Sequence, residues 1–209
     1  MTRKDVLTGI FKLFVLTALT GCGGGGGGGG GTPAGLIALP KTGQTTCSDT
    51  AGTTIACAGT GQDGALQTGV AGPSSRFTLD VTGACVTDNL TGLMWTRNAN
   101  LPATGAATTG VRTWQGALDY ANTLNLCGFT DWRLSNPKEL RSLVNYSLAD
   151  NAATLNTLGF NNVQTNIYWS SSSLASSPAF VWIIAMDYGN VQAFNKANSF
   201  YVWPVRAGQ

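Results

Sequence analysis

The chain has 209 residues, of which 12 are basic and 10 acidic, and it contains no histidine. Removal of residues 1–21 takes away three basic residues and one acidic residue, which leaves nine of each and a neutral chain. A neutral chain argues against nucleic acid as a partner and against tight electrostatic capture of sulfated glycans. The lack of histidine removes the commonest general base and the commonest metal ligand.

The N-terminal residues have the pattern of a secretion signal. Basic residues precede a short apolar run at residues 13–19, which is too short to span a bilayer. The run ends in Leu19-Thr20-Gly21-Cys22, which resembles the lipobox of bacterial lipoproteins, where the cysteine is lipidated and the chain is cut before it. We predict a signal peptide at residues 1–21 and a lipid on Cys22, with an ordinary cleaved signal as the alternative. Gly23 follows the cysteine, which by this resemblance favours the outer membrane, facing the periplasm or the cell surface.

Two further segments precede the predicted domain. Nine glycines follow Cys22, and such a run behaves as a flexible coil, so residues 22–35 are predicted to be a lipidated tether. Residues 36–75 are rich in glycine, threonine and alanine and have few large apolar side chains. Cys47 and Cys57 bracket a short turn or hairpin there, and in an exported protein such a pair more often forms a disulfide than a metal site. We expect a small disulfide-stapled lead-in segment that cannot bury a core of its own.

Residues 76–209 are long enough to form one domain with a hydrophobic core. Alternating polarity predicts a strand at residues 77–81, followed by short strands at 85–88 and 93–96. Asp88-Asn89 is typical of a turn, and a calcium-binding loop is the less favoured alternative. We expect no other metal and no cofactor. Thr113 caps a helix whose apolar residues recur at helical spacing, and we expect that helix to close at Cys127.

The four cysteines after Cys22 allow three connectivities. We predict Cys47–Cys57 and Cys85–Cys127, because Cys85 and Cys127 each lie beside a structural element. The second disulfide closes a loop of about forty residues, which is worth on the order of 4 kcal/mol in the chain-entropy model.

The centre of the chain carries the strongest local signal, Asp131-Trp132-Arg133-Leu134-Ser135-Asn136-Pro137-Lys138-Glu139-Leu140. It predicts a strand that leads into a capped helix. Asn136 can cap the helix, proline suits its first position, and Glu139 can complete a capping box. Trp132 is large enough to fix this corner in a core.

The C-terminal third is predicted to be an irregular stretch followed by strands. Residues 145–165 are expected to be irregular. The apolar run at 179–186 predicts a buried strand, which turns at 187–190 into a returning strand. A second turn at 195–198 leads to a closing strand at 200–206, so the terminal strands are expected to form an antiparallel meander.

Five motifs in order resemble the C-terminal domain family of the Lcl collagen-like adhesins, over about Phe77 to Gln209. They are Val86-Thr87-Asp88-Asn89-Leu90-Thr91-Gly92-Leu93-Met94-Trp95, Thr113-Trp114-Gln115-Gly116-Ala117-Leu118, Asp131-Trp132-Arg133-Leu134, Tyr168-Trp169-Ser170-Ser171-Ser172 and Val202-Trp203-Pro204-Val205-Arg206. The family usually has Pro-Thr after Trp-Arg-Leu, whereas here Ser135-Asn136 precedes the proline.

The resemblance implies an α+β, C-type-lectin-like domain in which two helices pack on small antiparallel sheets with many loops. The formylglycine-generating enzymes share that fold and the Trp-Arg-Leu helix, but after lipidation and disulfide pairing no free thiol remains here for a cysteine nucleophile. Some relatives bind sulfated glycans, an activity that the neutral charge does not favour. The residues expected to serve the structure are Trp95, Trp114, Trp132, Arg133, Asn136, Glu139 and Trp203.

The leading functional hypothesis is a lipid-anchored binding module for a glycan or an envelope protein, of unknown oligomeric state. In lectin-like domains the late strands and loops meet the ligand, which implies Trp169, Asp187, Asn190, Asn195 and Asn198, although core packing or a turn is the commoner role for each residue type. The alternatives are a structural or assembly lipoprotein and, less favoured, a glycan-active enzyme. The enzyme would need a carboxylate pair from among Asp88, Asp131, Glu139 and Asp187, and we expect no catalytic residue.

Overall fold

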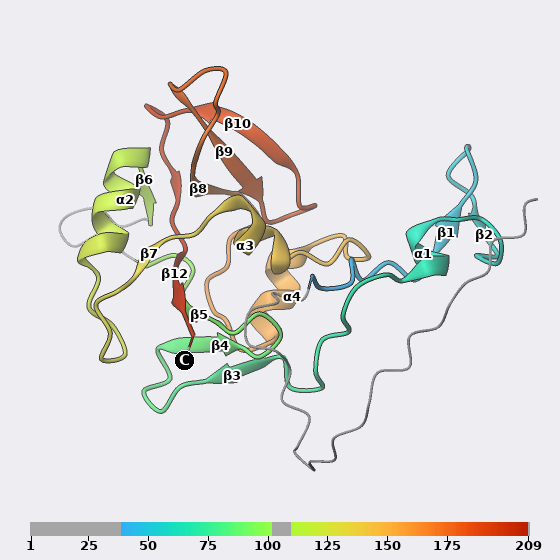
Figure 1. The fold of residues 1–209 in the computed structure, drawn as a ribbon, viewed down its shortest axis with the longest axis horizontal. Coiled ribbons are helices and arrows are strands. Elements are labelled where there is room, and N and C mark those ends of the chain that lie inside the picture. Colours follow the sequence, from blue (N-terminus) through green and yellow to red (C-terminus); the bar gives the residue numbers. More distant parts are fainter. Residues whose placement is uncertain (1–38, 102–109, 209) are drawn as a thin grey trace, which may run out of the picture. The chain divides into compact units, whose positions relative to one another are not determined.

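The computed structural model describes residues 39–101 and 110–208. The predicted signal peptide, Cys22 and the glycine tether lie outside the described residues. Within them the chain forms two five-stranded sheets, one two-stranded sheet and four short helices (Figure 1). None of the helices in these ranges has the length and hydropathy that a membrane span requires.

The lead-in segment holds a small hairpin and a single helical turn. Its elements are β1 (Cys47–Ser48), β2 (Thr54–Ile55) and α1 (Asp63–Leu66). Cys47 and Cys57 form the predicted disulfide, and Cys47 is buried. The Tyr146 backbone N–H donates to the Thr42 carbonyl at 2.8 Å, which connects the lead-in segment to the remaining fold.

One five-stranded sheet, called sheet I here, contains most of the late strands. In spatial order it comprises β10 (Val191–Asn195), β9 (Phe180–Ala185), β8 (Ile167–Ser173), β11 (Phe200–Tyr201) and β6 (Val111–Arg112). The predicted antiparallel meander is confirmed for β8, β9 and β10. It is wrong for the next strand, because β11 pairs parallel to β8 and antiparallel to β6.

The other five-stranded sheet, sheet II, is antiparallel throughout. In spatial order it comprises β3 (Phe77–Leu79), β4 (Cys85–Asp88), β5 (Leu93–Thr96), β12 (Pro204–Ala207) and β7 (Arg133–Leu134). The predicted closing strand at 200–206 is therefore two strands in two sheets. The chain crosses between them at Val202 and Trp203, and Figure 1 shows β12 running down beside β5 towards the C-terminus.

The prediction of two helices in the domain is short by one, because the described part of residues 76–209 contains three, and a fourth helix lies in the lead-in segment. The expected pair is present as α2 (Trp114–Thr123) and α3 (Pro137–Ser142). The stretch predicted to be irregular contains α4 (Asn151–Thr157), whose first turn is capped by Asp150 accepting from the Ala153 N–H at 3.0 Å. With seven residues, α4 is too short to show a clear apolar periodicity in sequence.

Helix α2 ends earlier than predicted. Its last residue is Thr123, and Leu124 already has extended backbone angles, φ −69° and ψ 128°. Cys127 lies beyond the helix with a positive φ of 54°, in a tight turn where Leu126 and Phe129 exchange backbone hydrogen bonds. The disulfide and this turn, rather than a helical C-cap at Cys127, fix the end of the segment.

Two hydrophobic clusters form the core. The larger, the Trp203 core, joins both sheets to α3 and α4, and Trp203 packs edge-on against Trp95 and Phe160 with ring centroids 5.6 and 5.1 Å apart. The smaller, the Trp169 core, joins α2 to sheet I and includes Ala117 and Ala121 of the helix. Trp95, Trp132 and Trp203, three of the tryptophans expected to serve the structure, are buried at 2% exposure or less.

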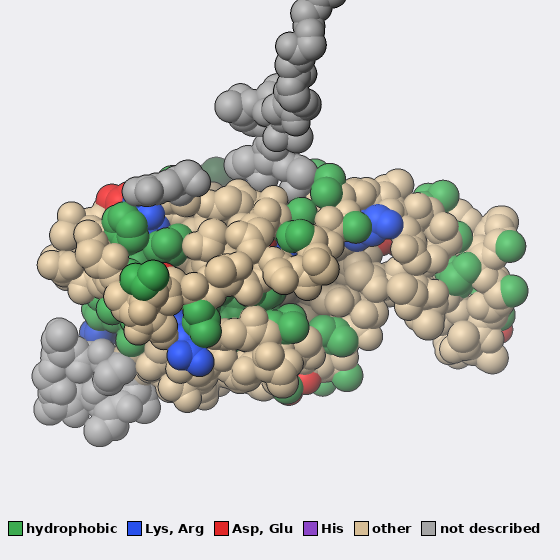
Figure 2. Space-filling model, turned by 90° about the horizontal axis from the view of Figure 1, so that it is seen from below, with side chains coloured by type: hydrophobic (Ala, Val, Ile, Leu, Met, Phe, Trp, Pro, Cys, Tyr) green, Lys and Arg blue, Asp and Glu red, His purple; other side chains and the backbone are tan. Residues whose placement is uncertain are grey.

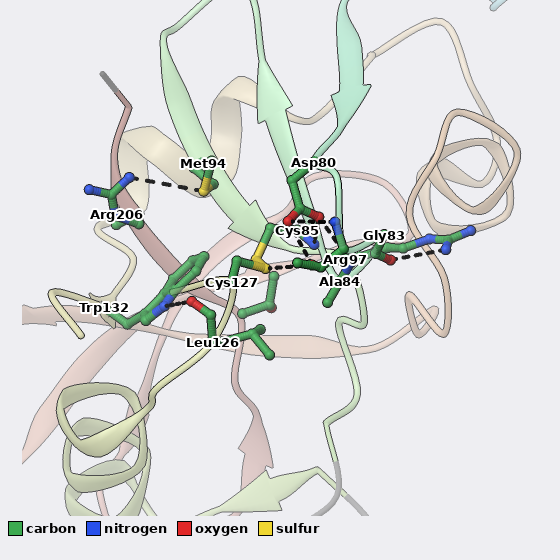
Figure 3. The surroundings of a disulfide bond; sticks show 12 residues. Asp80, Gly83, Ala84, Cys85, Met94, Arg97, Leu126, Cys127, Trp132 and Arg206 are labelled. Carbon is green, nitrogen blue, oxygen red and sulfur yellow. Dashed lines mark hydrogen bonds between the residues drawn. A yellow bond between two sulfur atoms is a disulfide. The ribbon is translucent and has the colours of Figure 1, made fainter. Parts of the chain in front are cut away.

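The predicted Cys85–Cys127 disulfide is present and lies next to a tight acidic turn (Figure 3). It connects β4 to the segment after α2. Beside it, one carboxylate oxygen of Asp80 accepts the N–H groups of Ala84 and Cys85 at 3.0 and 2.9 Å. Burial acts to raise the pKa of Asp80, but the hydrogen bonds from Thr82, Cys85 and Ala84 prevail and lower it.

Loss of the Cys85–Cys127 disulfide is expected to destabilise the fold strongly. Replacing both cysteines with alanine should lower the free energy of unfolding by about 4 kcal/mol, because the bridge closes a long loop of the unfolded chain. The Cys47→Ala/Cys57→Ala double variant is the control, since its bridge spans only 10 positions and closes a much shorter loop. Urea denaturation measures the free energy of unfolding of both double variants. Equal losses of stability in the two variants would contradict the larger role given to Cys85–Cys127.

The Asp80 turn predicts a specific pH dependence. Because folding lowers the pKa of Asp80 below its ordinary 3.8, its stabilising contribution is complete at neutral pH and is lost as the pH falls through the folded-state value. Asp80→Asn should therefore lower stability at pH 7 and flatten its decline below about pH 4. Asp119→Asn, on the exposed face of α2, is the control. The measurement is a series of denaturation curves between pH 7 and 2. Coincident curves for Asp80→Asn and the wild type would refute the expectation.

Candidate functional site

Each of the four successive side chains of the Asp131–Leu134 motif makes a different contact with the rest of the fold. The carboxylate of Asp131 receives two hydrogen bonds from the guanidinium of Arg206, at 2.7 and 3.1 Å. The Trp132 indole donates to the Leu126 carbonyl at 3.2 Å. Arg133 pairs with Glu139, while Leu134 is buried in the Trp169 core. All four side chains of the motif thus make contacts that hold β7 and the residues before it against their neighbours.

The predicted helix cap is confirmed in every part. The Asn136 side chain accepts the N–H groups of Lys138 and Glu139, and Pro137 is the first helical residue. Glu139 completes the capping box by accepting the Asn136 N–H at 2.8 Å. The same carboxylate receives two bonds from Arg133, at 2.8 and 2.6 Å. Glu139 is therefore held by three hydrogen bonds, one from the backbone of the helix cap and two from Arg133.

The pKa values of this motif follow from its ion pairs. The hydrogen bonds to Glu139 raise the pKa of Arg133 above its ordinary value, and those from Arg206 lower the pKa of Asp131. Both shifts hold the groups in their charged states, the reverse of what a general acid near neutral pH needs.

Asp88 is also committed to structure. It is fully buried, and Arg76 donates to both of its carboxylate oxygens at 3.0 and 2.8 Å. The Leu90 N–H and the Thr91 hydroxyl donate to the same carboxylate. A calcium ion at this turn would have to displace Arg76 from its partner.

One cluster of metal-ligand residue types occurs among the described residues, formed by Asp80, Cys85 and Cys127. Both sulfurs are in the disulfide, so neither can act as a thiolate ligand. This cluster is a structural turn beside a covalent bond.

Trp169, predicted to contact a ligand, is a core residue. Its side chain is fully buried, its indole donates to the Arg112 carbonyl at 2.8 Å, and its ring packs on Phe200 at 4.7 Å. The prediction of a surface tryptophan here is therefore wrong. Tryptophan is common in cores and at binding surfaces alike, and no local pattern separates the two roles.

The other four predicted ligand residues do not come together. Asp187 and Asn190 lie in the turn between β9 and β10, whereas Asn195 and Asn198 lie at the other end of β10. A five-residue strand separates the two turns by roughly 15 Å. Asn190, Asn195 and Asn198 are exposed, but they belong to two separate loops rather than one site.

A cavity lies between β3 and α4 and is called the β3–α4 groove. Its volume is about 820 Å³. One wall is the edge strand with the residues before it, and the other is α4 with the end of α3. The lining residues are Pro73, Ser74, Ser75, Arg76, Phe77, Thr78, Leu79, Leu143, Asn145, Leu148, Asn151, Thr154, Leu155, Thr157, Leu158 and Gly159.

The groove is electrically neutral. Among the described residues that line it, Arg76 alone carries a charge, and that charge is neutralised by buried Asp88. Leu79 and Leu158 face the groove and remain 44% and 49% exposed, which is high for leucine. Figure 2 shows the molecule from below the view of Figure 1, and the charged side chains on that face are few and scattered. The groove therefore suits a neutral, partly apolar ligand.

The groove could not be deduced from the sequence. Its two walls are far apart along the chain, and α4 was expected to be irregular. Exposed leucines have no sequence signature of their own, because the same pattern also marks core residues.

These observations define the class of protein, which is a disulfide-bonded, sheet-rich α+β domain. The polar side chains of its Asp131–Leu134 motif make structural contacts, and it carries a neutral groove. A family model for the Lcl C-terminal domain matches residues 84–206, more than half of the chain. The chain belongs to the Lcl C-terminal domain family, as its five motifs predicted. The lead-in segment and β3 lie outside the matched residues. No curated protein matches the chain.

Proposed function

We propose that the protein is a binding module of the bacterial cell envelope and that its ligand occupies the β3–α4 groove. The single observation that carries this proposal is the groove, whose volume falls within the usual range for ligand sites. Its exposed leucines supply apolar area for a ligand to bury, and its threonine, serine and asparagine side chains supply hydrogen-bonding groups.

The proposal includes an anchor and a fold type. Lipidation at Cys22 would hold the domain at the outer membrane, with residues 22–35 as a tether, residues 36–75 as a lead-in and residues 76–209 as the binding domain. The sequence motif at residues 19–22 supports the lipid. The family's motifs support a C-type-lectin-like arrangement of the α+β domain.

A binding role is favoured over catalysis by the state of the acidic residues. Asp88, Asp131 and Glu139 are each held by an arginine, and each has a structural task. A glycosidase needs one carboxyl group that can hold a proton and a second one nearby. The proposal therefore includes no catalytic residue and no cofactor.

A glycan contact at the turn between β9 and β10 is the second candidate. Tyr188 is 60% exposed there, next to exposed Asn190. A tyrosine ring can stack on a sugar while an amide bonds its hydroxyls. This candidate retains part of the sequence-based prediction, with Tyr188 in the role first given to Trp169.

The anchor is tested by labelling. Cells that express the wild-type chain are expected to incorporate labelled palmitate into it, and the Cys22→Ser variant should lose the label and leave the membrane fraction. The Cys47→Ser/Cys57→Ser variant, which keeps Cys22, should stay labelled. Label on Cys22→Ser would disprove lipidation at this position.

The groove is tested by screening and substitution together. The full-length chain, purified in detergent, is screened on a glycan array and a peptide array, and each hit is measured again with two variants. Leu158→Glu places a charge in the groove and should weaken binding at least tenfold, whereas Val81→Glu should leave it unchanged. Val81 is fully exposed and does not line the groove, so it is the matched control. Hits that ignore Leu158→Glu but weaken with Tyr188→Ala would move the site to the β9–β10 turn.

A further inference from the structure

Strand β3 is an open sheet edge. It is the first strand in the order of sheet II and pairs only with β4 among the described strands. The Asn89 N–H donates to the Arg76 carbonyl at 2.7 Å, and the Asp80 N–H donates to the Cys85 carbonyl at 3.0 Å. In an antiparallel ladder these bonds place Thr78 opposite Thr87 in the hydrogen-bonded pair. The backbone N–H and C=O groups of Phe77 and Leu79 consequently point away from β4.

Within residues 39–101 and 110–208, this edge has one of the usual protections, a short length, since β3 comprises three residues. The other devices that guard natural edge strands are lysine, proline, a bulge or a covering element. The strand itself reads Phe-Thr-Leu, and the charged residues that flank it are both engaged elsewhere. Arg76 is paired with Asp88, and Asp80 is bound into its own turn. Among the described residues, β4 is the only strand that pairs with β3, so the outer side of the edge can accept another strand.

The groove lies beside this edge and is closed on its other side by α4. Phe77 packs against Phe160 in the core, with ring centroids 4.9 Å apart, so Phe77 and Leu79 project towards the face that α4 covers. The arrangement of an edge strand, a neutral groove and a helical wall is the one in which proteins bind extended peptides by strand addition.

We propose, building on the function given above, that the ligand of the groove is an extended, uncharged peptide segment that adds to β3 as a further strand. Its backbone pairs with the outward N–H and C=O groups of Phe77 and Leu79. Every second side chain of the peptide faces Leu155 and Leu158, so apolar residues at alternate positions are selected. The neutral lining excludes strongly charged segments, because their charges would lose water without gaining a partner.

The probe is an arrayed library of uncharged heptapeptides with leucine, valine, alanine and threonine at varied positions. The full-length chain should bind members with apolar residues at alternate positions, and Leu158→Glu should weaken this binding at least tenfold. Scanning the best peptide with N-methylated residues should give period-two sensitivity, with about a tenfold loss at alternate amides and little effect between them. Each sensitive position marks an amide that donates to β3.

Two substitutions of one residue separate backbone pairing from side-chain contact. Leu79→Pro removes the outward N–H of β3 but no bond to β4, and proline is tolerated on edge strands. Leu79→Ala keeps that N–H and removes only the side chain. Strand addition predicts a larger loss of peptide affinity for Leu79→Pro than for Leu79→Ala, with both variants folded by circular dichroism.

The failures of the two proposals are distinguishable. Peptide binding that Leu158→Glu abolishes but that shows no period-two sensitivity overturns strand addition and leaves the groove as the site. Glycan hits that depend on Leu158, together with a peptide array that shows no binding, also overturn strand addition and leave the groove as the site. Hits of either class that are indifferent to Leu158→Glu overturn both.

Discussion

Four consecutive side chains, Asp131 to Leu134, connect β7 to four different parts of the domain, and the fold depends on this junction. Asp131 fixes Arg206 of β12, Arg133 fixes Glu139 of α3, and Trp132 and Leu134 enter the core. The Arg133–Glu139 pair is effective because Glu139 also closes the helix cap, so one carboxylate sets both the start of α3 and its angle to β7. Removing Glu139 would leave the half-buried Arg133 without its partner and the Asn136 N–H without its acceptor, while the Asn136 side chain would still cap the helix.

Three of the acidic residues that the sequence offers for catalysis, Asp88, Asp131 and Glu139, are each paired with an arginine. A domain with few charges uses them where partly buried backbone and side-chain groups need partners. The two ligand sites that we propose, the β3–α4 groove and the exposed β9–β10 turn, lie away from these ion pairs. A neutral groove next to free backbone groups favours recognition of shape and main chain over recognition of charge.

Features that depend on near neighbours could be predicted from the sequence. The Asn136-Pro137-Glu139 cap, the hairpin of β9 and β10 and the strands around Cys85 follow local rules, and the chemistry of export favoured disulfides. Features that depend on distant partners could not. The parallel pairing of β11 with β8, the burial of Trp169 and the α4 wall of the groove are decided by what lies across the core, which periodicity over a few residues does not reveal.

The crossing of the chain at Val202 and Trp203 has a consequence for the order of folding. β11 lies between β8 and β6, and β12 lies between β5 and β7, so residues 200–207 supply an interior strand to each sheet. Trp203 also lies at the centre of the larger core. Neither sheet can therefore be completed before residues 200–207 have been synthesised. This topology postpones closure of both sheets until the last strands of the domain are available.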